Sequence, residues 1–251
     1  MTIHGLRRDG DTVVHKYGYN KSIPNGSYEG LLSLTGAFPW LQAASTVRIK
    51  AGGNAADDAG SSPQGAGARA IVVQGLDGAG AEVEETIITA GAAASVATTT
   101  TFMRVFRAWV SAAGEYTGVN TAAIVVQVNS AASPEVDLIE IPAGEGQSQH
   151  CAYTIPAGKT GYLASFTVQA DGLKAADFRV YTRAAFTTVT PPYEAKRVRF
   201  YMDGILGVAS IKPETPIMAI PALTDIWMEA SGGGAGTEAV GDMEIIIVND
   251  Y

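Results

Sequence analysis

Hydrophobic and polar residues alternate along much of this chain with the two-residue period of β-strands. In Thr46–Lys50, Val47 and Ile49 fall on one face of the predicted strand, and Arg48 and Lys50 fall on the other. A segment of this kind has one buried face and one solvated face. The alternation therefore predicts a half-buried strand directly after the first 45 residues.

A hairpin is predicted next, after a long loop at Ala51–Ala68. Arg69–Gly75 is rich in β-branched residues, and Val83–Thr89 follows it across the turn Leu76–Gly80, which contains Asp-Gly. Asp-Gly between two strand-like runs is a strong hairpin signal. We therefore expect these two runs to pair.

Similar runs continue to the C-terminus, and none shows a convincing helical period over three turns. The spacing of the runs is typical of β-sandwiches and barrels. Within Tyr162–Val168, the alternation places Phe166 and Val168 on the face opposite to Leu163. The remaining strands are predicted within Thr98–Ser111, Thr121–Asn129, Glu135–Ile141, Gln149–Ile155, Lys159–Gln169, Phe178–Phe186, Arg197–Met202, Ile217–Ile220, Asp225–Ala230 and Met243–Asn249.

The sequence Ile-Pro-Ala-Gly occurs twice, at Ile141–Gly144 and at Ile155–Gly158. Proline fixes φ and cannot donate to a strand ladder, and glycine accepts backbone angles that other residues avoid, so each copy should end a strand and turn the chain. We interpret this stretch as the junction of two β-rich halves. The predicted fold is all-β, with two consecutive antiparallel β-sandwich or jelly-roll-like domains at residues 46–144 and 145–251.

Residues 1–45 are polar, rich in turn signals and without a clean period, so they are predicted to form an extended N-terminal arm. Tyr17, Tyr19, Phe38 and Trp40 are its expected anchors, laid against the protein's own body or against a neighbour. Together with Lys21 they are the predicted partner-binding residues. The alternative is an ordinary N-terminal strand and loop.

The charge is unevenly distributed over the chain. The formal net charge is −8, and residues 1–50 carry six Lys and Arg against three acidic residues, 6 − 3 = +3, which leaves −8 − 3 = −11 for the remainder. An acidic body lacks the basic face that nucleic acid requires. A mildly basic arm on such a body favours contact with other copies or with a partner protein.

The cysteine content and the apolar runs limit the setting of the protein. One cysteine, Cys151, allows no intrachain disulfide and no cysteine-based structural zinc site. The N-terminal residues show no apolar signal-peptide core, and the apolar runs are too short for a membrane span. We expect a protein that is kept in a reducing cytoplasm, without membrane contact.

Three groups of residues suggest chemistry, and each has a structural alternative that we favour. His150 and Cys151 suggest a nucleophile pair, but neighbours in a strand point to opposite faces, so a core cysteine beside a surface histidine is expected. Asp57 and Asp58 are candidate Ca²⁺ ligands without the EF-hand spacing. The three tryptophans suggest a sugar platform, although Trp109 and Trp227 sit in apolar strands that favour core packing. We predict no enzyme, no cofactor and no metal.

Several motifs resemble one known family. These are Tyr17–Asn20, the loop Gly65–Gly67 followed by the hairpin Ala68–Ile87, and the junction Ile141–Leu163. Together they are similar to structural proteins of tailed bacteriophages, over about residues 15–170. The motifs consist of turns and alternating strands, so they indicate a family and carry no catalytic residues with them.

The resemblance implies a virion component, with capsid decoration (cement) as the expected role. The implied partner is the major capsid protein, which a homodimer or homotrimer would bind on the outside of the capsid after assembly in the host cytoplasm. The competing interpretation is a neck, tail or head-fibre component that binds glycans on the host surface.

Overall fold

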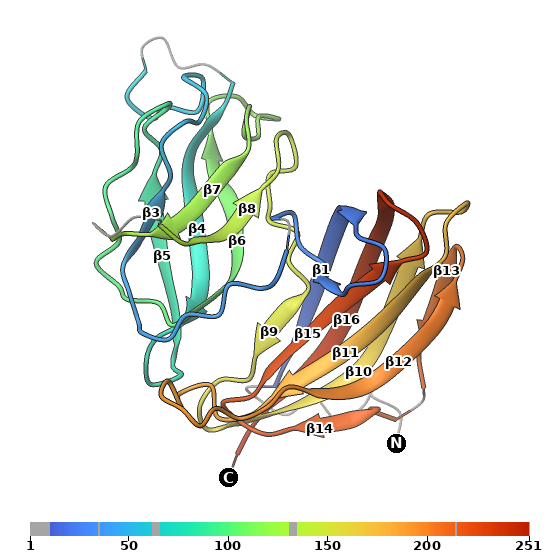
Figure 1. Ribbon diagram of the computed structural model, residues 1–251. Helices are drawn as coiled ribbons and strands as arrows, with labels where there is room; N and C mark the ends of the chain where they lie inside the picture. Colours follow the sequence, from blue (N-terminus) through green and yellow to red (C-terminus); the bar gives the residue numbers. More distant parts are fainter. Residues whose placement is uncertain (1–10, 35, 62–65, 131–134, 214, 251) are drawn as a thin grey trace. The chain divides into compact units, whose positions relative to one another are not determined.

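The computed structural model describes residues 11–34, 36–61, 66–130, 135–213 and 215–250, and these residues form antiparallel sheets without any helix (Figure 1). The all-β prediction is therefore confirmed. Arg7, Arg8 and Gly65, which contributed to the predicted basic arm and to the family resemblance, lie outside the described residues.

The chain divides into two compact units. One combines the residues up to Ala37 with those from His150 onward, and we call it the terminal unit; the other is Phe38–Gln149, the central unit. The predicted boundary between residues 144 and 145 lies five residues before the observed one. The predicted separate domain for residues 1–45 is wrong, because its described part is divided between the two units.

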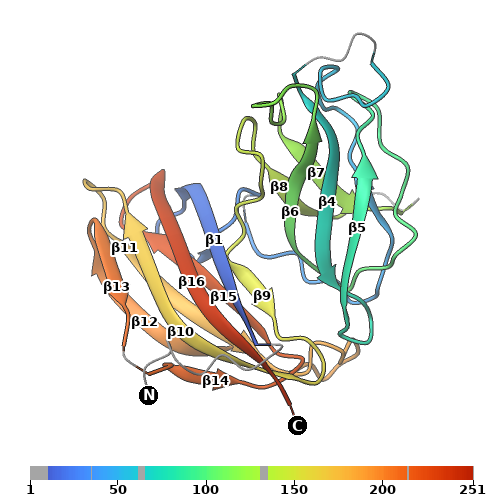
Figure 2. The same ribbon diagram turned by 180° about the vertical axis from the view of Figure 1, so that it is seen from behind.

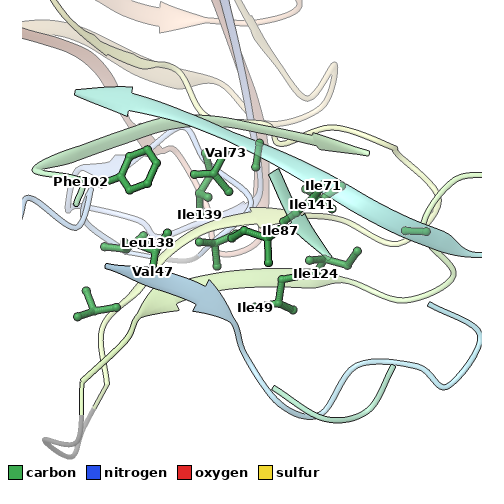
Figure 3. Packing of buried hydrophobic residues seen from close by; sticks show 14 residues of the cluster. Val47, Ile49, Ile71, Val73, Ile87, Phe102, Ile124, Leu138, Ile139 and Ile141 are labelled. Carbon is green, nitrogen blue, oxygen red and sulfur yellow. The ribbon is translucent and has the colours of Figure 1, made fainter. Parts of the chain in front are cut away.

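The central unit contains two three-stranded sheets, β3-β7-β8 and β5-β4-β6. Apolar residues from both sheets form one core, which includes Val47 and Ile49 on the predicted inner face of β3 (Figure 3). The predicted hairpin is confirmed, since β4 and β5 pair from Ala70↔Ile88 to Leu76↔Glu82. The strands are β3 (Val47–Ile49), β4 (Ala68–Leu76), β5 (Glu82–Ile88), β6 (Arg104–Ala113), β7 (Ile124–Val128) and β8 (Asp137–Ile141).

The terminal unit contains two five-stranded sheets. In the first, the order is β1-β16-β10-β13 with β14 also on β10; in the second, it is β12-β11-β15-β2 with β9 also on β15 (Figures 1 and 2). The strands are β1 (Thr12–Ile23), β2 (Glu29–Gly30), β9 (Ala152–Thr154), β10 (Lys159–Ala170), β11 (Ala176–Arg183), β12 (Arg197–Ile205), β13 (Val208–Ile211), β14 (Met218–Ile220), β15 (Asp225–Gly232) and β16 (Thr237–Asn249).

Strand β1 corrects the prediction of an extended arm and confirms the alternative of an ordinary N-terminal strand. It pairs with β16 along most of its length, from Thr12↔Ile247 to Ile23↔Thr237. Its buried face carries Lys16, Gly18 and Asn20, while its tyrosines are half-buried on the other face. A strand whose inner face is polar or glycine has no apolar alternation, which is why its sequence gave no strand signal.

Two glycines allow the inner face of β1 and β16 to approach the backbone of the second sheet. Gly18 and Gly241 are partners across the β1–β16 ladder. A Cβ atom at Gly18 would lie 1.9 Å from the Leu31 carbonyl oxygen and 2.6 Å from the Cys151 amide nitrogen. At Gly241, it would lie 2.4 Å from Leu31 Cδ1 and 2.9 Å from Met228 Sδ. At Gly18 a side chain would overlap backbone atoms, whereas at Gly241 it would require the Leu31 and Met228 side chains to move.

The backbone groups at this approach are paired with one another. The Cys151 amide donates to the Leu31 carbonyl at 2.9 Å, the Leu31 amide to Met228 at 3.1 Å, and the Met228 amide to Cys151 at 3.1 Å. The His150 amide also donates to the Tyr17 carbonyl of β1 at 2.7 Å. The N-terminal segment therefore joins both sheets of the terminal unit.

A β-bulge changes the predicted faces of β10. The register of β10 against β16 shifts between Leu163 and Ser165, so Ala164 is the extra residue. As a result Leu163 is buried together with Phe166 and Val168, although strict alternation placed it on the opposite face. Phe166 contacts Phe200 of β12, with ring centroids 5.3 Å apart, so side chains of the two sheets meet.

We expect Gly18→Ala to destabilise the terminal unit by about 3 kcal/mol, because the added methyl overlaps backbone atoms that are held by hydrogen bonds. Trp227 lies in the terminal unit and the other two tryptophans in the central unit. Urea unfolding followed by Trp227 fluorescence in a W40F/W109F background would measure the loss. Gly172→Ala is the control, since its Cβ would meet nothing within 4 Å. Equal stability of the two variants would refute the close approach.

Candidate functional site

The five predicted partner-binding residues are divided between the two units. Tyr17, Tyr19 and Lys21 lie on β1, and of these only Lys21 is exposed. Tyr19 donates from its hydroxyl to Glu238 at 2.8 Å, and burial together with this carboxylate raises the pKa of Tyr19 to about 12. Phe38 and Trp40 belong to the central unit. The role of these residues in binding a partner stays a prediction.

Phe38 and Trp40 make contacts within the central unit. Phe38 is buried, and its ring centroid lies 5.7 Å from that of the half-buried Trp40. The Arg104 guanidinium lies over the Trp40 ring, 5.1 Å from the centroid, and donates to the Leu41 carbonyl at 3.0 Å. These two aromatic residues therefore anchor their segment to the body of their own unit.

His150 and Cys151 are both buried, so the expectation for the cysteine is confirmed and that of a surface histidine is wrong. Burial, with the charge of Lys16, holds the pKa of His150 well below its usual range. Burial also raises the pKa of the Cys151 thiol far above its usual range. At neutral pH this pair is a neutral imidazole beside a protonated thiol, which lacks the thiolate that a nucleophile requires.

Asp57, one of the two candidate Ca²⁺ ligands, is buried and already holds three backbone donors. Its carboxylate accepts hydrogen bonds from the amides of Ala68 at 2.8 Å, Thr121 at 2.8 Å and Ala122 at 3.0 Å. The carboxylate of the neighbouring Asp58 accepts a local hydrogen bond from the Gly60 amide at 2.8 Å. No group of three metal-binding side chains occurs in the described part of the chain. Asp57 thus fastens a loop to β4 and to the segment before β7.

The tryptophans do not form one platform. Trp227 is buried, and its ring stacks on Tyr181 at a centroid distance of 5.5 Å. Trp109 is half-buried beneath the Arg107 guanidinium, 4.9 Å from the ring centroid. Core packing is confirmed for Trp227, whereas Trp109 is only partly covered.

A different surface of the terminal unit carries exposed apolar residues. Leu173 is 92% exposed in the β10–β11 turn, Leu206 is 59% exposed in the β12–β13 turn, and Val208 is 64% exposed at the start of β13. We call these three residues the apolar loop end. Figures 1 and 2 show both turns at the same end of the unit.

Hydrogen bonds hold the apolar loop end in place. The Ala170 amide donates to the Gly207 carbonyl at 2.9 Å, and Val208 pairs with Gln169 of β10. Lys174 donates from Nζ to the carbonyl of Ala235 at 3.0 Å, in the β15–β16 turn. Three large apolar side chains are therefore presented to solvent on turns that are connected to the sheets.

The apolar loop end was not among the predicted site residues, although the sequence contains a signal for it. Leu173 follows Asp171-Gly172, and Gly207 separates Leu206 from Val208. Leucine and valine next to glycine within tight turns have nothing of their own chain to pack against. Turn residues of this kind merit attention as contacts for another molecule.

A second cluster lies on one face of the β12-β11-β15-β2 sheet. The Arg179 guanidinium lies over Tyr28 at 3.9 Å and over Tyr201 at 5.3 Å from the ring centroids. The Tyr201 hydroxyl donates to Asp203 at 2.8 Å, and this bond raises the pKa of Tyr201. Asp177 accepts from the Gly204 amide at 2.8 Å. We call Tyr28, Asp177, Arg179, Tyr201 and Asp203 the tyrosine–arginine cluster.

Comparisons with known proteins do not assign this chain to a family. No family model and no curated protein sequence matches the chain. Among solved structures it is similar to the VP2 subviral particle of infectious bursal disease virus, with 10% identity, 96% of this chain and 77% of that chain covered and a TM-score of 0.17. A structure of the Gx strain of the same virus gives 10% identity, coverage of 96% and 76%, and a TM-score of 0.18. These scores are too low to support an argument about fold or function.

In the part of the chain that the structure describes, no helix is long and apolar enough to cross a membrane. The terminal unit offers apolar contact at its turns and stacked aromatic and charged groups on one sheet face.

We expect Asp57→Ala to destabilise the central unit by about 3 kcal/mol, because three amides lose their buried acceptor. Amide hydrogen exchange of β4 and β7, read by mass spectrometry, would measure it. Asp58→Ala, which removes one local bond, should cost less than about 1 kcal/mol. Added Ca²⁺ should leave the exchange of the unaltered protein unchanged, and a protective effect of Ca²⁺ would contradict this assignment.

Proposed function

We propose that this protein is a structural component of a tailed-bacteriophage virion that binds the outside of the capsid and connects neighbouring capsomers. Its partner in this proposal is the major capsid protein, and its two units are β-sandwiches, the terminal one jelly-roll-like. The motifs at Tyr17–Asn20, Ala68–Ile87 and Ile141–Leu163 support the family, and the apolar loop end supports the contact.

The apolar loop end is the observation on which the proposal depends. Leucine and valine side chains that are more than half exposed contribute favourable free energy when another surface covers them. Complete burial of one such side chain contributes about 1.5–3 kcal/mol. Three such side chains on fixed turns form a contact that needs little ordering on binding. A protein that acts by summed contact area requires a surface of this kind.

The acidic charge of the chain supports the same role. With a net charge of −8, charge repulsion opposes non-specific association of the protein in solution. Complementary charge on the capsid would then fix the register of binding. The proposal places no chemical reaction on the protein.

A second function is favoured by the tyrosine–arginine cluster. Tyr201 is 51% exposed, and its neighbours supply carboxylates and a guanidinium on the same face of the sheet. An aromatic ring for stacking with polar groups around it is the arrangement that sugars require of a binding site. A neck, tail or head-fibre component that binds host-surface glycans is therefore the alternative.

To test capsid binding, the protein would be added to heads of a phage that carries its gene, assembled without it. We expect the combined variant L173D/L206D/V208D to bind more than about a hundredfold more weakly than the unaltered protein, because it loses three apolar contacts. Bound protein would be measured by sedimentation with the heads.

The matched control is V96D/Y116D, which changes two highly exposed residues of the central unit. It should bind the heads as the unaltered protein does, and far-ultraviolet circular dichroism should show both variants folded. Full occupancy by L173D/L206D/V208D would refute the apolar loop end as the contact. Labelling of the tail alone in electron micrographs of virions would support the alternative function.

For the alternative, a glycan array would be probed with the isolated protein. If the tyrosine–arginine cluster binds sugar, Tyr201→Ala should weaken the signal by about tenfold or more, because the stacking ring is lost. Tyr116→Ala, which removes a more exposed tyrosine ring from the central unit, should leave binding unchanged. Absence of any glycan signal, or equal loss in both variants, would eliminate this function.

A further inference from the structure

The two central strands of the second sheet in the terminal unit place two aromatic rings beside a buried carboxylate. Tyr181 of β11 and Trp227 of β15 are paired directly across the sheet, and their rings stack at a centroid distance of 5.5 Å. The indole Nε1 of Trp227 donates to Glu229 Oε1 at 2.8 Å. All three residues are buried. Strands β11 and β15 therefore hold both rings and the carboxylate in fixed positions.

These side chains bind the ammonium group of Lys196. The Lys196 Nζ donates to the two carboxylate oxygens of Glu229 at 3.1 Å and 3.0 Å, and it lies 4.2 Å from the centroid of the Tyr181 ring. A carboxylate combined with the face of an aromatic ring is an arrangement that recognises ammonium groups. We call Tyr181, Trp227 and Glu229 the ammonium cage.

Lys196 is held differently from the residues of the cage. Its side chain is 50% exposed, whereas that of Glu229 is 10% exposed. It precedes β12 directly, at the end of a connection in which residues 190–196 are all exposed. A small molecule in solvent therefore has access to the position of the Lys196 ammonium. Lys196 itself loses little when it is replaced, because a lysine ammonium is strongly hydrated in water.

The cage requires a cation at this position. If Lys196 leaves, the Glu229 carboxylate retains the hydrogen bond from Trp227 but loses its counter-ion. A buried charge without its partner is strongly unfavourable, so replacement by another cation is favoured. The neighbouring Arg179 is engaged elsewhere, because it donates to the Tyr181 hydroxyl at 3.2 Å and its guanidinium lies over two other rings of the tyrosine–arginine cluster.

We propose that the ammonium cage is a binding site for a small molecule with a primary ammonium group, and that Lys196 occupies the cage when this ligand is absent. A primary ammonium reproduces both hydrogen bonds to Glu229 and the contact with the Tyr181 ring. A quaternary ammonium has no N–H group and reproduces only the ring contact, so the cage prefers the primary form.

Ligand binding has a structural consequence for the connection before β12. Lys196 links this connection to the sheet face formed by β11 and β15, so its displacement releases that link. The inference goes beyond the proposed function and depends on neither capsid binding nor the exposed ring of Tyr201.

The test is binding of n-butylammonium chloride to the full chain, followed by Trp227 fluorescence in the W40F/W109F background. Lys196 competes with the ligand at a high effective concentration, because it belongs to the same chain. We therefore expect Lys196→Ala to bind n-butylammonium at least about tenfold more tightly than the protein that retains Lys196, which should itself bind saturably. K196A/E229Q should be at least about tenfold weaker than Lys196→Ala, because the cage has lost its charge.

Lys174→Ala is the matched control, because Lys174 of the same unit donates to the backbone carbonyls of Ala235 and Gly236 instead of to a cage. It should bind n-butylammonium no more tightly than the unaltered protein. Sodium chloride at equal concentration accounts for ionic strength. Tetramethylammonium should bind Lys196→Ala more weakly than n-butylammonium does, since it cannot donate to Glu229.

Two sugars distinguish the sources of the ammonium group. Tighter binding of glucosamine than of n-butylammonium, with no binding of N-acetylglucosamine, would indicate an amino sugar. Tighter binding of n-butylammonium would indicate a simple amine, and both results support the cage.

Circular dichroism would show that each variant is folded. If Lys196→Ala unfolds, n-butylammonium should restore its structure and sodium chloride should not. The proposal is overturned if n-butylammonium neither binds Lys196→Ala saturably nor restores it, if Lys174→Ala gains equal affinity, or if Glu229→Gln has no effect. Binding to Lys196→Ala with none to the unaltered protein at about hundredfold higher ligand concentration would identify Lys196 as a permanent structural partner, and would also overturn it.

Discussion

The facing glycines Gly18 and Gly241 are the constraint on which the terminal unit depends. Because Gly18 has no side chain, the backbone of Leu31 and Cys151 can approach β1, and because Gly241 has none, the side chains of Leu31 and Met228 can pack against β16. The hydrogen bonds among Leu31, Cys151 and Met228 then connect this point to the second sheet. The N-terminal strand is therefore an integral edge strand of the terminal unit, paired with β16 and joined to the second sheet.

Polar groups hold the central unit together in a comparable way. Asp57 receives three amides from two distant segments, and Ser95 and Thr98 accept from the amides of Ile49 and Val47 at the edge of β3. Asp57, Ser95 and Thr98 are buried, and hydrogen bonds to backbone amides offset the cost of burying them. Residues that suggested chemistry in the sequence, Asp57 and Cys151, thus serve the backbone or the core.

The sequence predicts those parts of the fold whose signals are local. The hairpin β4–β5 follows from Asp-Gly between β-branched runs, and both Ile-Pro-Ala-Gly copies form turns where proline and glycine require them. The sequence left open whether the first 45 residues form an arm or an ordinary N-terminal strand, because the buried face of β1 is Lys16, Gly18 and Asn20. The burial of Leu163 was missed because a bulge shifts the alternation. The apolar loop end could not be located, since it depends on which turns the folded chain brings to one end.

The order of the strands also determines how the chain can be divided. The central unit leaves the terminal unit after Ala37 and returns at His150, where Leu32 and His150 form a β-bridge and Cys151 is bonded to Leu31. The central unit is therefore an insertion in the terminal unit, and the segments that enter and leave it are neighbours. A shortened chain in which a few flexible residues replace Phe38–Gln149 would retain every strand of the remaining body. During translation, the central unit is synthesised completely before β16, the partner of β1, has been made. The central unit can therefore fold before the terminal unit.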